Sequence, residues 1–164
     1  MESCIILDIE TSPLPWDEFD DVQHEYLLRN AETVEEQEKK KSEMALAPFT
    51  GMIVCIGLIH MKRGDDGDYV VEKKVCLVRD RHNLDDISKD ESGDLTIVRS
   101  SELRMLGFFW NYLRQAHDVA RPHYVSFNGR GFDMPFLMLR SAALGIRPSV
   151  NLMNGSRWNY KEYH

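Results

Sequence analysis

The stretch Cys4-Ile5-Ile6-Leu7-Asp8-Ile9-Glu10-Thr11 begins with an apolar run and then carries two acidic residues. Because residues 4–7 show no polar alternation, they predict a strand that is buried on both faces. Side chains alternate along a strand, so Asp8 and Glu10 should point to the same side, roughly 6.5 to 7 Å apart along the backbone. Carboxylates at this spacing suit two divalent cations about 3.5 to 4 Å apart, a pair that can stabilise phosphodiester hydrolysis. The alternative is a solvated strand end.

A second stretch, Phe127-Asn128-Gly129-Arg130-Gly131-Phe132-Asp133, overlaps a short predicted strand over residues 123–127. Residues 128–131 predict a turn with unusual dihedral angles, and Asp133-Met134-Pro135 predicts a helix start. Backbone amides at a helix N-terminus favour an ionised carboxylate, the form that binds hard cations. The glycines would let a phosphate approach the backbone, and Arg130 offers it a bidentate donor. The alternative is a Gly-rich turn in which Asp133 is a plain N-cap.

Together the two stretches resemble the DEDD superfamily of 3′-to-5′ exonucleases. Residues 8–11 are similar to the first exonuclease motif, and residues 128–133 are similar to the second. Residues 126–135, 52–57 and 102–110 most resemble the predicted exonucleases related to the proofreading domain of family B DNA polymerases. The resemblance implies an α/β, ribonuclease H-like fold with a mixed five-stranded-type sheet flanked by helices. It also implies two Mg²⁺ or Mn²⁺ ions and release of nucleoside 5′-monophosphates from DNA or RNA.

The same resemblance assigns roles to single residues. Asp8, Glu10 and Asp133 would be the catalytic residues and would hold both cations. The expected substrate-binding residues are Thr11, Asn128, Gly129, Arg130 and Phe132, of which Asn128 and Arg130 would position the scissile phosphate. Turn formation is the competing explanation for Asn128. Pro13, Leu14 and Trp16 would form an apolar wedge against the last base, or would simply pack within their loop.

The chain departs from the family pattern at its end. The family has a fourth carboxylate in a third motif, preceded by a Tyr or His that orients or deprotonates water. That motif would begin within residues 157–164, and no aspartate follows. Tyr160, Tyr163 and His164 are candidates for the Tyr or His, with a frayed tail as the alternative, and the spacing of Glu162 does not favour it as a substitute ligand. We therefore expect the C-terminal helix to be missing, activity to be weak or absent in residues 1–164, and a longer version to be active.

Length and composition agree with one domain over residues 1–164, incomplete at its C-terminus. The chain has 164 residues, of which 43% are hydrophobic, enough for one core. Its three cysteines, Cys4, Cys55 and Cys76, lie in strand-like runs, which predicts buried free thiols and a cytoplasmic location. No stretch resembles a signal peptide or a membrane span.

The net charge of −7 is unevenly distributed. Residues 17–47 have a net charge of −6, whereas residues 121–164 have a net charge of +4. Because phosphate attraction depends on local fields, overall acidity does not exclude a single-stranded or 3′-ended nucleic acid as the partner. The alternative is that these arginines are ordinary surface charges.

The expected order of elements is strand, acidic helical insertion, two strands, loop, helix, strand and helix. Residues 51–59 and 69–78 predict an antiparallel hairpin around the turn at residues 64–67, and the strand at residues 123–127 should pair parallel with the first. A helix from Ser100, with Ser100 as its cap, should bury one stripe in the core, formed by Leu103, Leu106, Phe109, Trp110 and Leu113. Residues 17–47 would be an insertion, with a short amphipathic helix followed by a solvated helix or disordered segment, and residues 80–95 a flexible loop.

Two other functions remain open. The chain could be a catalytically inactive nucleic-acid-binding or assembly module that retains the exonuclease fold, with salt-sensitive binding and no turnover. It could also be a protein-interaction domain that acts through the acidic insertion.

Overall fold

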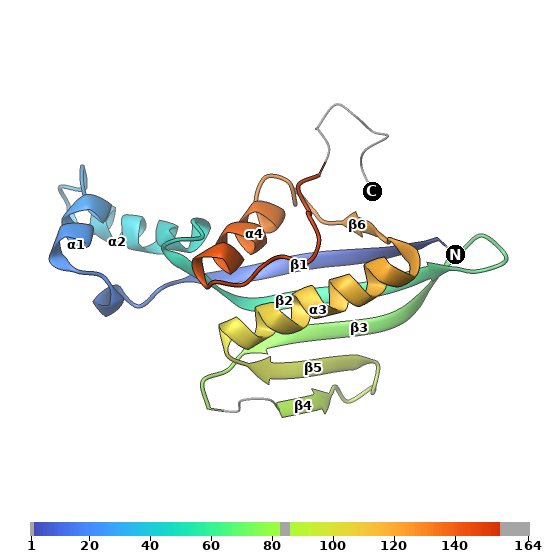
Figure 1. Cartoon of the computed structure of the whole chain (residues 1–164). Helices are drawn as coiled ribbons and strands as arrows, with labels where there is room; N and C mark the ends of the chain where they lie inside the picture. Colours follow the sequence, from blue (N-terminus) through green and yellow to red (C-terminus); the bar gives the residue numbers. More distant parts are fainter. Residues whose placement is uncertain (1, 83–85, 155–164) are drawn as a thin grey trace.

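The computed structural model describes residues 2–82 and 86–154 (Figure 1). The elements, with 3-10 helices labelled η, are β1 (Ser3–Pro13), η1 (Trp16–Glu18), α1 (Asp21–Leu27), α2 (Val34–Glu43), η2 (Met44–Leu46), β2 (Gly51–Arg63), β3 (Tyr69–Arg79), β4 (Asp86–Lys89), β5 (Leu95–Ser100), α3 (Glu102–Ala120), β6 (His123–Val125) and α4 (Asp133–Ala143). Within these ranges, no helix is both long enough and apolar enough to cross a membrane.

The strands form one mixed sheet in the order β4-β5-β3-β2-β1-β6. β2 pairs antiparallel with both β1 and β3, which confirms the predicted hairpin. β6 pairs parallel with β1, as predicted, through Cys4 to Ile6. The sheet therefore has six strands rather than five, and as a mixed sheet flanked by helices it is compatible with a ribonuclease H-like fold.

The additional strands correct the prediction of a flexible loop over residues 80–95. β4 and β5 form an antiparallel hairpin, and β5 pairs parallel with β3. Asp90 organises the turn between them, because its carboxylate accepts a hydrogen bond from the amide of Leu95 at 2.9 Å. Many of the polar residues of this segment lie in the turn and on β4, the outer strand of the sheet, where charged residues are common. Composition alone therefore suggested a loop where a paired hairpin exists.

Helix α3 supplies the main helical face of the core. Its buried residues include Leu106, Phe109, Trp110 and Leu113, which confirms that the aromatic stripe is core. Leu103 is the exception, because it is 51% exposed. The predicted cap was also one residue early: Ser100 is buried at the end of β5, and the hydroxyl of Ser101 accepts the hydrogen bond from the amide of Arg104.

Strand β1 is buried on one face only, which corrects the prediction of burial on both. Ile5, Leu7 and Ile9 belong to the core, whereas Ile6 is 37% exposed and Asp8 and Glu10 are exposed. The reason is that α3 and α4 lie on the same face of the sheet (Figure 1). We call the opposite face, which carries Ile6, Asp8 and Glu10 on β1, the open face.

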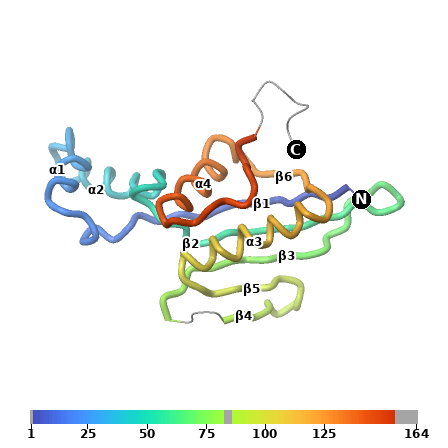
Figure 2. The backbone as a smooth tube through the Cα atoms, viewed as in Figure 1, coloured from blue at the N-terminus to red at the C-terminus, as the bar shows by residue number. Residues whose placement is uncertain are grey.

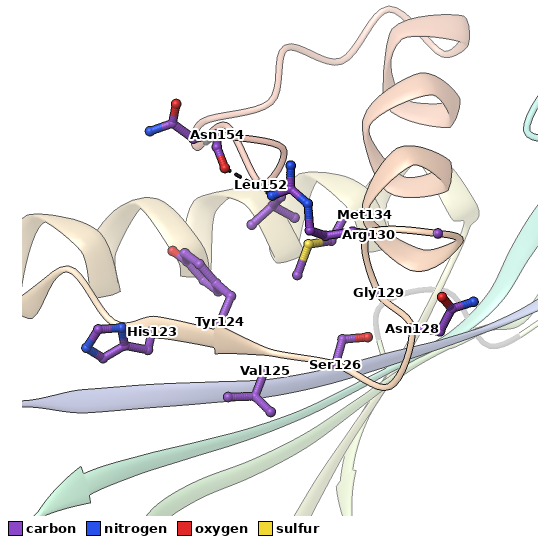
Figure 3. A pocket seen from close by; sticks show the side chains of 11 residues that line it. His123, Tyr124, Val125, Ser126, Asn128, Gly129, Arg130, Met134, Leu152 and Asn154 are labelled. Atoms are coloured by element: carbon purple, nitrogen blue, oxygen red, sulfur yellow. Dashed lines mark hydrogen bonds between the residues drawn. The ribbon is translucent and has the colours of Figure 1, made fainter. Parts of the chain in front are cut away.

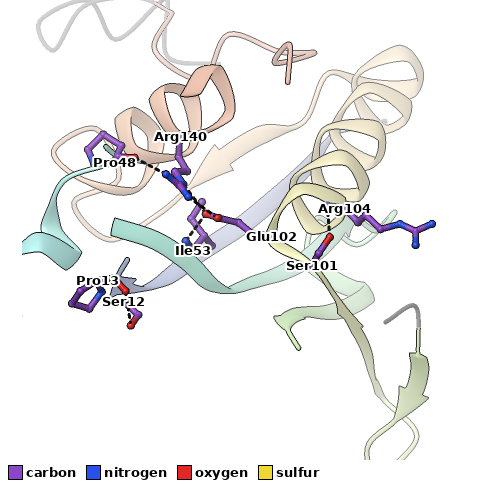
Figure 4. A network of polar contacts seen from close by, with 8 residues as sticks. All are labelled: Ser12, Pro13, Pro48, Ile53, Ser101, Glu102, Arg104 and Arg140. Atoms are coloured by element: carbon purple, nitrogen blue, oxygen red, sulfur yellow. Dashed lines mark hydrogen bonds and ion pairs between the residues drawn. The ribbon is translucent and has the colours of Figure 1, made fainter. Parts of the chain in front are cut away.

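A buried ion pair joins the two core helices to the sheet (Figure 4). Two nitrogens of Arg140 on α4 each lie 2.9 Å from one carboxylate oxygen of Glu102 on α3. The same carboxylate accepts a 2.8 Å hydrogen bond from the amide of Ile53 on β2, and Arg140 also donates to the carbonyl of Pro48. This network therefore fixes α3, α4 and the start of β2 to one another.

The acidic insertion forms helices that extend beyond one end of the sheet (Figures 1 and 2). Helices α1 and α2 each begin with a capping box, formed by Asp20 with Gln23 and by Thr33 with Glu36. Neither helix has a buried residue, so α2 is the solvated helix of the two alternatives for that segment. The ring of Trp16 stacks on His24 with centroids 4.1 Å apart, which favours loop packing over a base wedge.

His60 on β2 should make stability fall in mild acid. Its Nδ1 lies 2.8 Å from the hydroxyl of Tyr112, and its buried Nε2 has no hydrogen-bond partner among the described residues. Burial, as the largest cause, lowers the pKa of His60, and nearby Lys62 and Lys73 lower it further against the opposing effect of Glu72. The unfolded chain therefore takes up the proton first, and stability is lost as the pH falls from about 6.5 towards the folded-state pKa.

Denaturant unfolding between pH 7.5 and pH 5 would test this expectation. His60→Gln should flatten the decline over that window, because glutamine does not titrate. His82→Gln, a change at an exposed histidine, is the matched control and should keep the wild-type slope. Equal slopes for wild type and His60→Gln would contradict the expectation.

Candidate active site

The two carboxylates of the first stretch lie on the open face of β1. Asp8 pairs across with Gly57 on β2, and Glu10 pairs with Cys55. The ladder is regular between these two pairs, and its irregularity comes only after Glu10. Both carboxylates therefore project from one regular strand segment to the same side, as the alternation of the strand predicted.

Asp133 of the second stretch reaches this segment from the other edge of β1. The pairing of β1 with β6 ends at Ile6 and Val125, so no strand of the described residues lies beside the next residues of β1 on that edge. There the carboxylate of Asp133 accepts a hydrogen bond from the backbone amide of Ile9 at 3.2 Å. Ile9 lies between Asp8 and Glu10, so this contact brings the two stretches together across 124 positions of sequence.

The alternative role of Asp133 as a plain N-cap is wrong. Asp133 is the first residue of α4, and the N-cap position belongs to Phe132, whose side chain makes no capping hydrogen bond. The side chain of Asp133 is directed to β1 instead, and the residue is only 3% exposed. Its position at the N-terminus of α4 is the one predicted from the sequence.

The turn between β6 and α4 depends on close packing as well as on unusual dihedrals. Asn128 has a φ of 53°, and its carbonyl accepts hydrogen bonds from the amides of Gly131 and Phe132. A Cβ atom added at Gly129 would lie 2.5 Å from the Cβ of Ser126, and one at Gly131 would lie 2.5 Å from the side-chain oxygen of Asn128. The positive φ thus falls on Asn128. A glycine is needed at position 129 because the Cβ of Ser126 leaves no room for another Cβ, whereas a Cβ at position 131 would require the side chain of Asn128 to move.

A cavity of about 670 Å³ opens beside this turn (Figure 3). Arg130 lies at its border, where its Nη1 donates a 3.0 Å hydrogen bond to the carbonyl of Asn154. Tyr124 and Ser126 also line it, but their hydroxyls are buried and have no hydrogen-bond partner among the described residues. Burial raises the pKa of Tyr124 to about 12, so this phenol stays protonated at neutral pH. The cavity therefore has the Arg130 cation at its border, next to the second stretch.

Two further substrate-binding candidates, Phe132 and Thr11, are only partly exposed. Phe132 is half-buried and packs on Phe136, with ring centroids 5.5 Å apart, and Thr11 is half-buried just after the irregularity in β1. By contrast Phe127, which sequence reasoning did not single out, is 95% exposed. Only the tertiary structure reveals that this aromatic ring is available.

The three carboxylates do not form a ready-made metal site. Over residues 2–82 and 86–154, no group of three or more His, Cys, Asp or Glu side chains is close enough to hold a metal ion. The type of donor nevertheless fits Mg²⁺ and Mn²⁺, which prefer oxygen ligands. The third-motif candidates Tyr160, Glu162, Tyr163 and His164 lie outside the described residues.

Comparison with known families identifies the class of protein. A family model described as a predicted 3′-5′ exonuclease related to the exonuclease domain of PolB matches residues 70–164. The match covers more than half of the chain, so the protein belongs to this family, which confirms the family predicted from the sequence. No curated protein matches the chain.

The matched range includes Asp133 but not Asp8 or Glu10. The contact between the amide of Ile9 and Asp133 therefore links the matched range to the first stretch, which lies outside it.

Proposed function

We propose that the protein is a metal-dependent 3′-to-5′ exonuclease that hydrolyses phosphodiester bonds of DNA or RNA and releases nucleoside 5′-monophosphates. In this proposal residues 1–164 belong to one ribonuclease H-like domain. The observation that carries it is the hydrogen bond from the amide of Ile9 to Asp133. It places a third carboxylate, held at a helix N-terminus, beside the strand segment that bears Asp8 and Glu10.

Asp8, Glu10 and Asp133 would hold the cations. A pair of Mg²⁺ or Mn²⁺ ions would supply charge stabilisation for the attacking and leaving oxygens. Because Asp8 and Glu10 are exposed on the open face, their side chains can turn towards a common ligand. Asp133 is fixed by its buried contact with Ile9, so it would serve as the rigid reference point of the site.

The second stretch would hold the substrate. Arg130 and Asn128 supply polar groups beside the cavity, where they would position the scissile phosphate. The expected roles of Thr11, Gly129 and Phe132 in binding the terminal nucleotide belong to the same proposal.

A single-turnover assay tests the proposal. The substrate is a single-stranded oligonucleotide labelled on its 3′-terminal nucleotide, with protein in excess and Mn²⁺ present. From a version extended past His164 we expect labelled nucleoside 5′-monophosphate, and none from a circular oligonucleotide that has no 3′ end. Residues 1–164 alone should release little or none. Glu10→Gln should lower the rate at least about tenfold to a hundredfold, the range seen when only an outer partner of a metal ligand is lost. Glu91→Gln, at an exposed glutamate in the β4–β5 turn, is the control.

The enzyme proposal fails if neither residues 1–164 nor a version extended past His164 releases mononucleotides with Mn²⁺. The second candidate function, a catalytically inactive nucleic-acid-binding module, is favoured by the lack of a ready-made three-ligand group among the described residues. It predicts salt-sensitive binding of the same oligonucleotide, no release of mononucleotides, and no Mn²⁺ bound at Asp8.

Phe127 should contribute to binding of the single strand by base stacking. The ring is exposed, follows β6 and directly precedes Asn128. Phe127→Ala should weaken binding of a single-stranded oligonucleotide by about 1–3 kcal/mol, measured by fluorescence anisotropy without divalent cations. Phe108→Ala, at a partly exposed phenylalanine on α3, should leave binding unchanged. Equal affinities of Phe127→Ala and wild type would exclude this role.

A further inference from the structure

Two thiols lie in contact on neighbouring strands of the sheet. The sulfur atoms of Cys55 on β2 and Cys76 on β3 are 3.2 Å apart, within hydrogen-bond distance. In the ladder Cys55 pairs with Val78, and Cys76 pairs with Gly57, so the two cysteines are diagonal neighbours. Both thiols are free, as predicted, but they are half-buried, which corrects the prediction that they are buried.

The pair lies on the open face, next to the candidate site. Ile56 and Leu58 of β2 are in the core, as are Val75 and Leu77 of β3, so the alternate residues Cys55 and Cys76 point away from it. Cys55 is the cross-strand partner of Glu10.

Gly57 on β2 lies between Cys76 on β3 and Asp8 on β1. It pairs with Asp8 on one side and with Cys76 on the other, and it places no side chain between them. The two thiols and the two carboxylates therefore surround Gly57, where the open face of the sheet has no side chain.

We propose that Cys55 and Cys76 form a redox-active dithiol that closes reversibly to a disulfide with a small-molecule disulfide, such as oxidised glutathione, as oxidant. A disulfide has a sulfur–sulfur distance of about 2.05 Å, so closure needs the sulfurs to approach by roughly 1 Å. The two strands are already paired, and the sulfurs are already in contact. The formation of the disulfide does not depend on the proposed exonuclease activity.

The exchange is balanced without any other reactant. The thiolate of one cysteine attacks a sulfur of oxidised glutathione, forms a mixed disulfide and releases one glutathione thiolate. The second cysteine then attacks the protein sulfur of the mixed disulfide and releases the second glutathione. The protein loses two protons and two electrons in total, and one oxidised glutathione takes them up to become two reduced molecules. Excess reduced glutathione reverses both steps.

Cys4 supplies an internal control. It lies on β1 opposite Met61, six positions along the ladder from Glu10 and Cys55. At about 3.3 to 3.4 Å per residue, Cys4 is roughly 20 Å along the strands from Cys55. Cys76 is level with Asp8, so it is roughly 13 Å along the strands from Cys4 and two strands away. Cys4 can therefore form a mixed disulfide with glutathione, but folded protein offers it no intramolecular partner at contact distance.

The test is incubation of the folded protein with oxidised glutathione, followed by intact-mass measurement, alkylation of remaining thiols and peptide mapping. We expect an intramolecular disulfide between Cys55 and Cys76 in wild type and in Cys4→Ser. Cys55→Ser and Cys76→Ser should instead retain a glutathione adduct on the remaining member of the pair. In denaturant the preference for this pairing should disappear, because proximity is lost.

Each other outcome overturns the proposal. The time allowed for the reaction is the time in which the glutathione adduct on Cys55→Ser reaches its plateau. The proposal fails if Cys55 and Cys76 of folded wild type are still free, or carry glutathione, after that time. It also fails if the mapped disulfide involves Cys4, or if reduced glutathione does not restore the two thiols.

Discussion

Asp133→Asn should remove most of the Mn²⁺ affinity and nuclease activity while leaving the fold nearly intact. The asparagine oxygen can still accept the hydrogen bond from the amide of Ile9, which Asp133 now accepts at 3.2 Å. The substitution removes only the negative charge, so it should cost no more than about 1 kcal/mol of stability at the start of α4. Without that charge the site loses its fixed ligand, and Mn²⁺ affinity should fall at least about tenfold to a hundredfold. Titration of Mn²⁺ followed by electron paramagnetic resonance measures the affinity, and the single-turnover assay measures the activity.

Asp133→Ala separates the structural role from the metal role. Alanine leaves the buried amide of Ile9 without a partner, which should cost about 1–3 kcal/mol more stability than asparagine does. Both variants should lose Mn²⁺ affinity equally, whereas only alanine should lower the denaturant midpoint clearly. If Asp133→Asn binds Mn²⁺ as tightly as wild type does, Asp133 is a structural residue and the proposed ligand set is wrong.

Breaking the ion pair between Glu102 and Arg140 should give the largest loss of stability. The two side chains are only 10% and 8% exposed, and their contact is bidentate. Removing one partner leaves the other charge buried and uncompensated, which typically costs about 3–5 kcal/mol. Because whole domains are stable by only about 5–15 kcal/mol, Arg140→Met should shift the urea midpoint strongly or leave the protein largely unfolded.

A double-mutant cycle shows whether the loss comes from the unpaired charge. Glu102→Leu combined with Arg140→Met removes both charges, so it should cost much less than the sum of the single changes. A residual cost of about 1–3 kcal/mol is expected because the amide of Ile53 loses its acceptor. Lys39→Ala, which removes an exposed pair with Glu43, is the control and should change stability by less than about 1 kcal/mol. Additive single effects would contradict this account.

The sequence predicted the central strands well because their apolar runs and turn residues are local signals. The β2–β3 hairpin, the parallel pairing of β6 with β1, and the helix start at Asp133 were all correct. The errors arose where local composition is ambiguous. The polar segment at residues 80–95 contains β4 and the start of β5, because strands at a sheet edge tolerate charge. Ser100 and Ser101 are equally good caps in sequence, and only the pairing of β5 decides between them.

The candidate site shows the same division. The residues of its two stretches were recognised from sequence, and the family match over residues 70–164 supports the class. The spatial arrangement of these residues was not predictable from the sequence. It depends on where β6 stops pairing with β1 and on the position of the start of α4 relative to β1. That geometry places Asp133 on the amide of Ile9 rather than in a cluster with Asp8 and Glu10.

By itself, the amino-acid sequence determined the order of the central elements, the candidate carboxylates and the family resemblance of this protein, since each depends on neighbours along the chain. The tertiary structure alone decided which face of β1 is open and that Glu102 pairs with Arg140. It also brought Cys55 into contact with Cys76. These features depend on contacts between residues distant in sequence, and a local pattern carries no information about which distant groups will pack together.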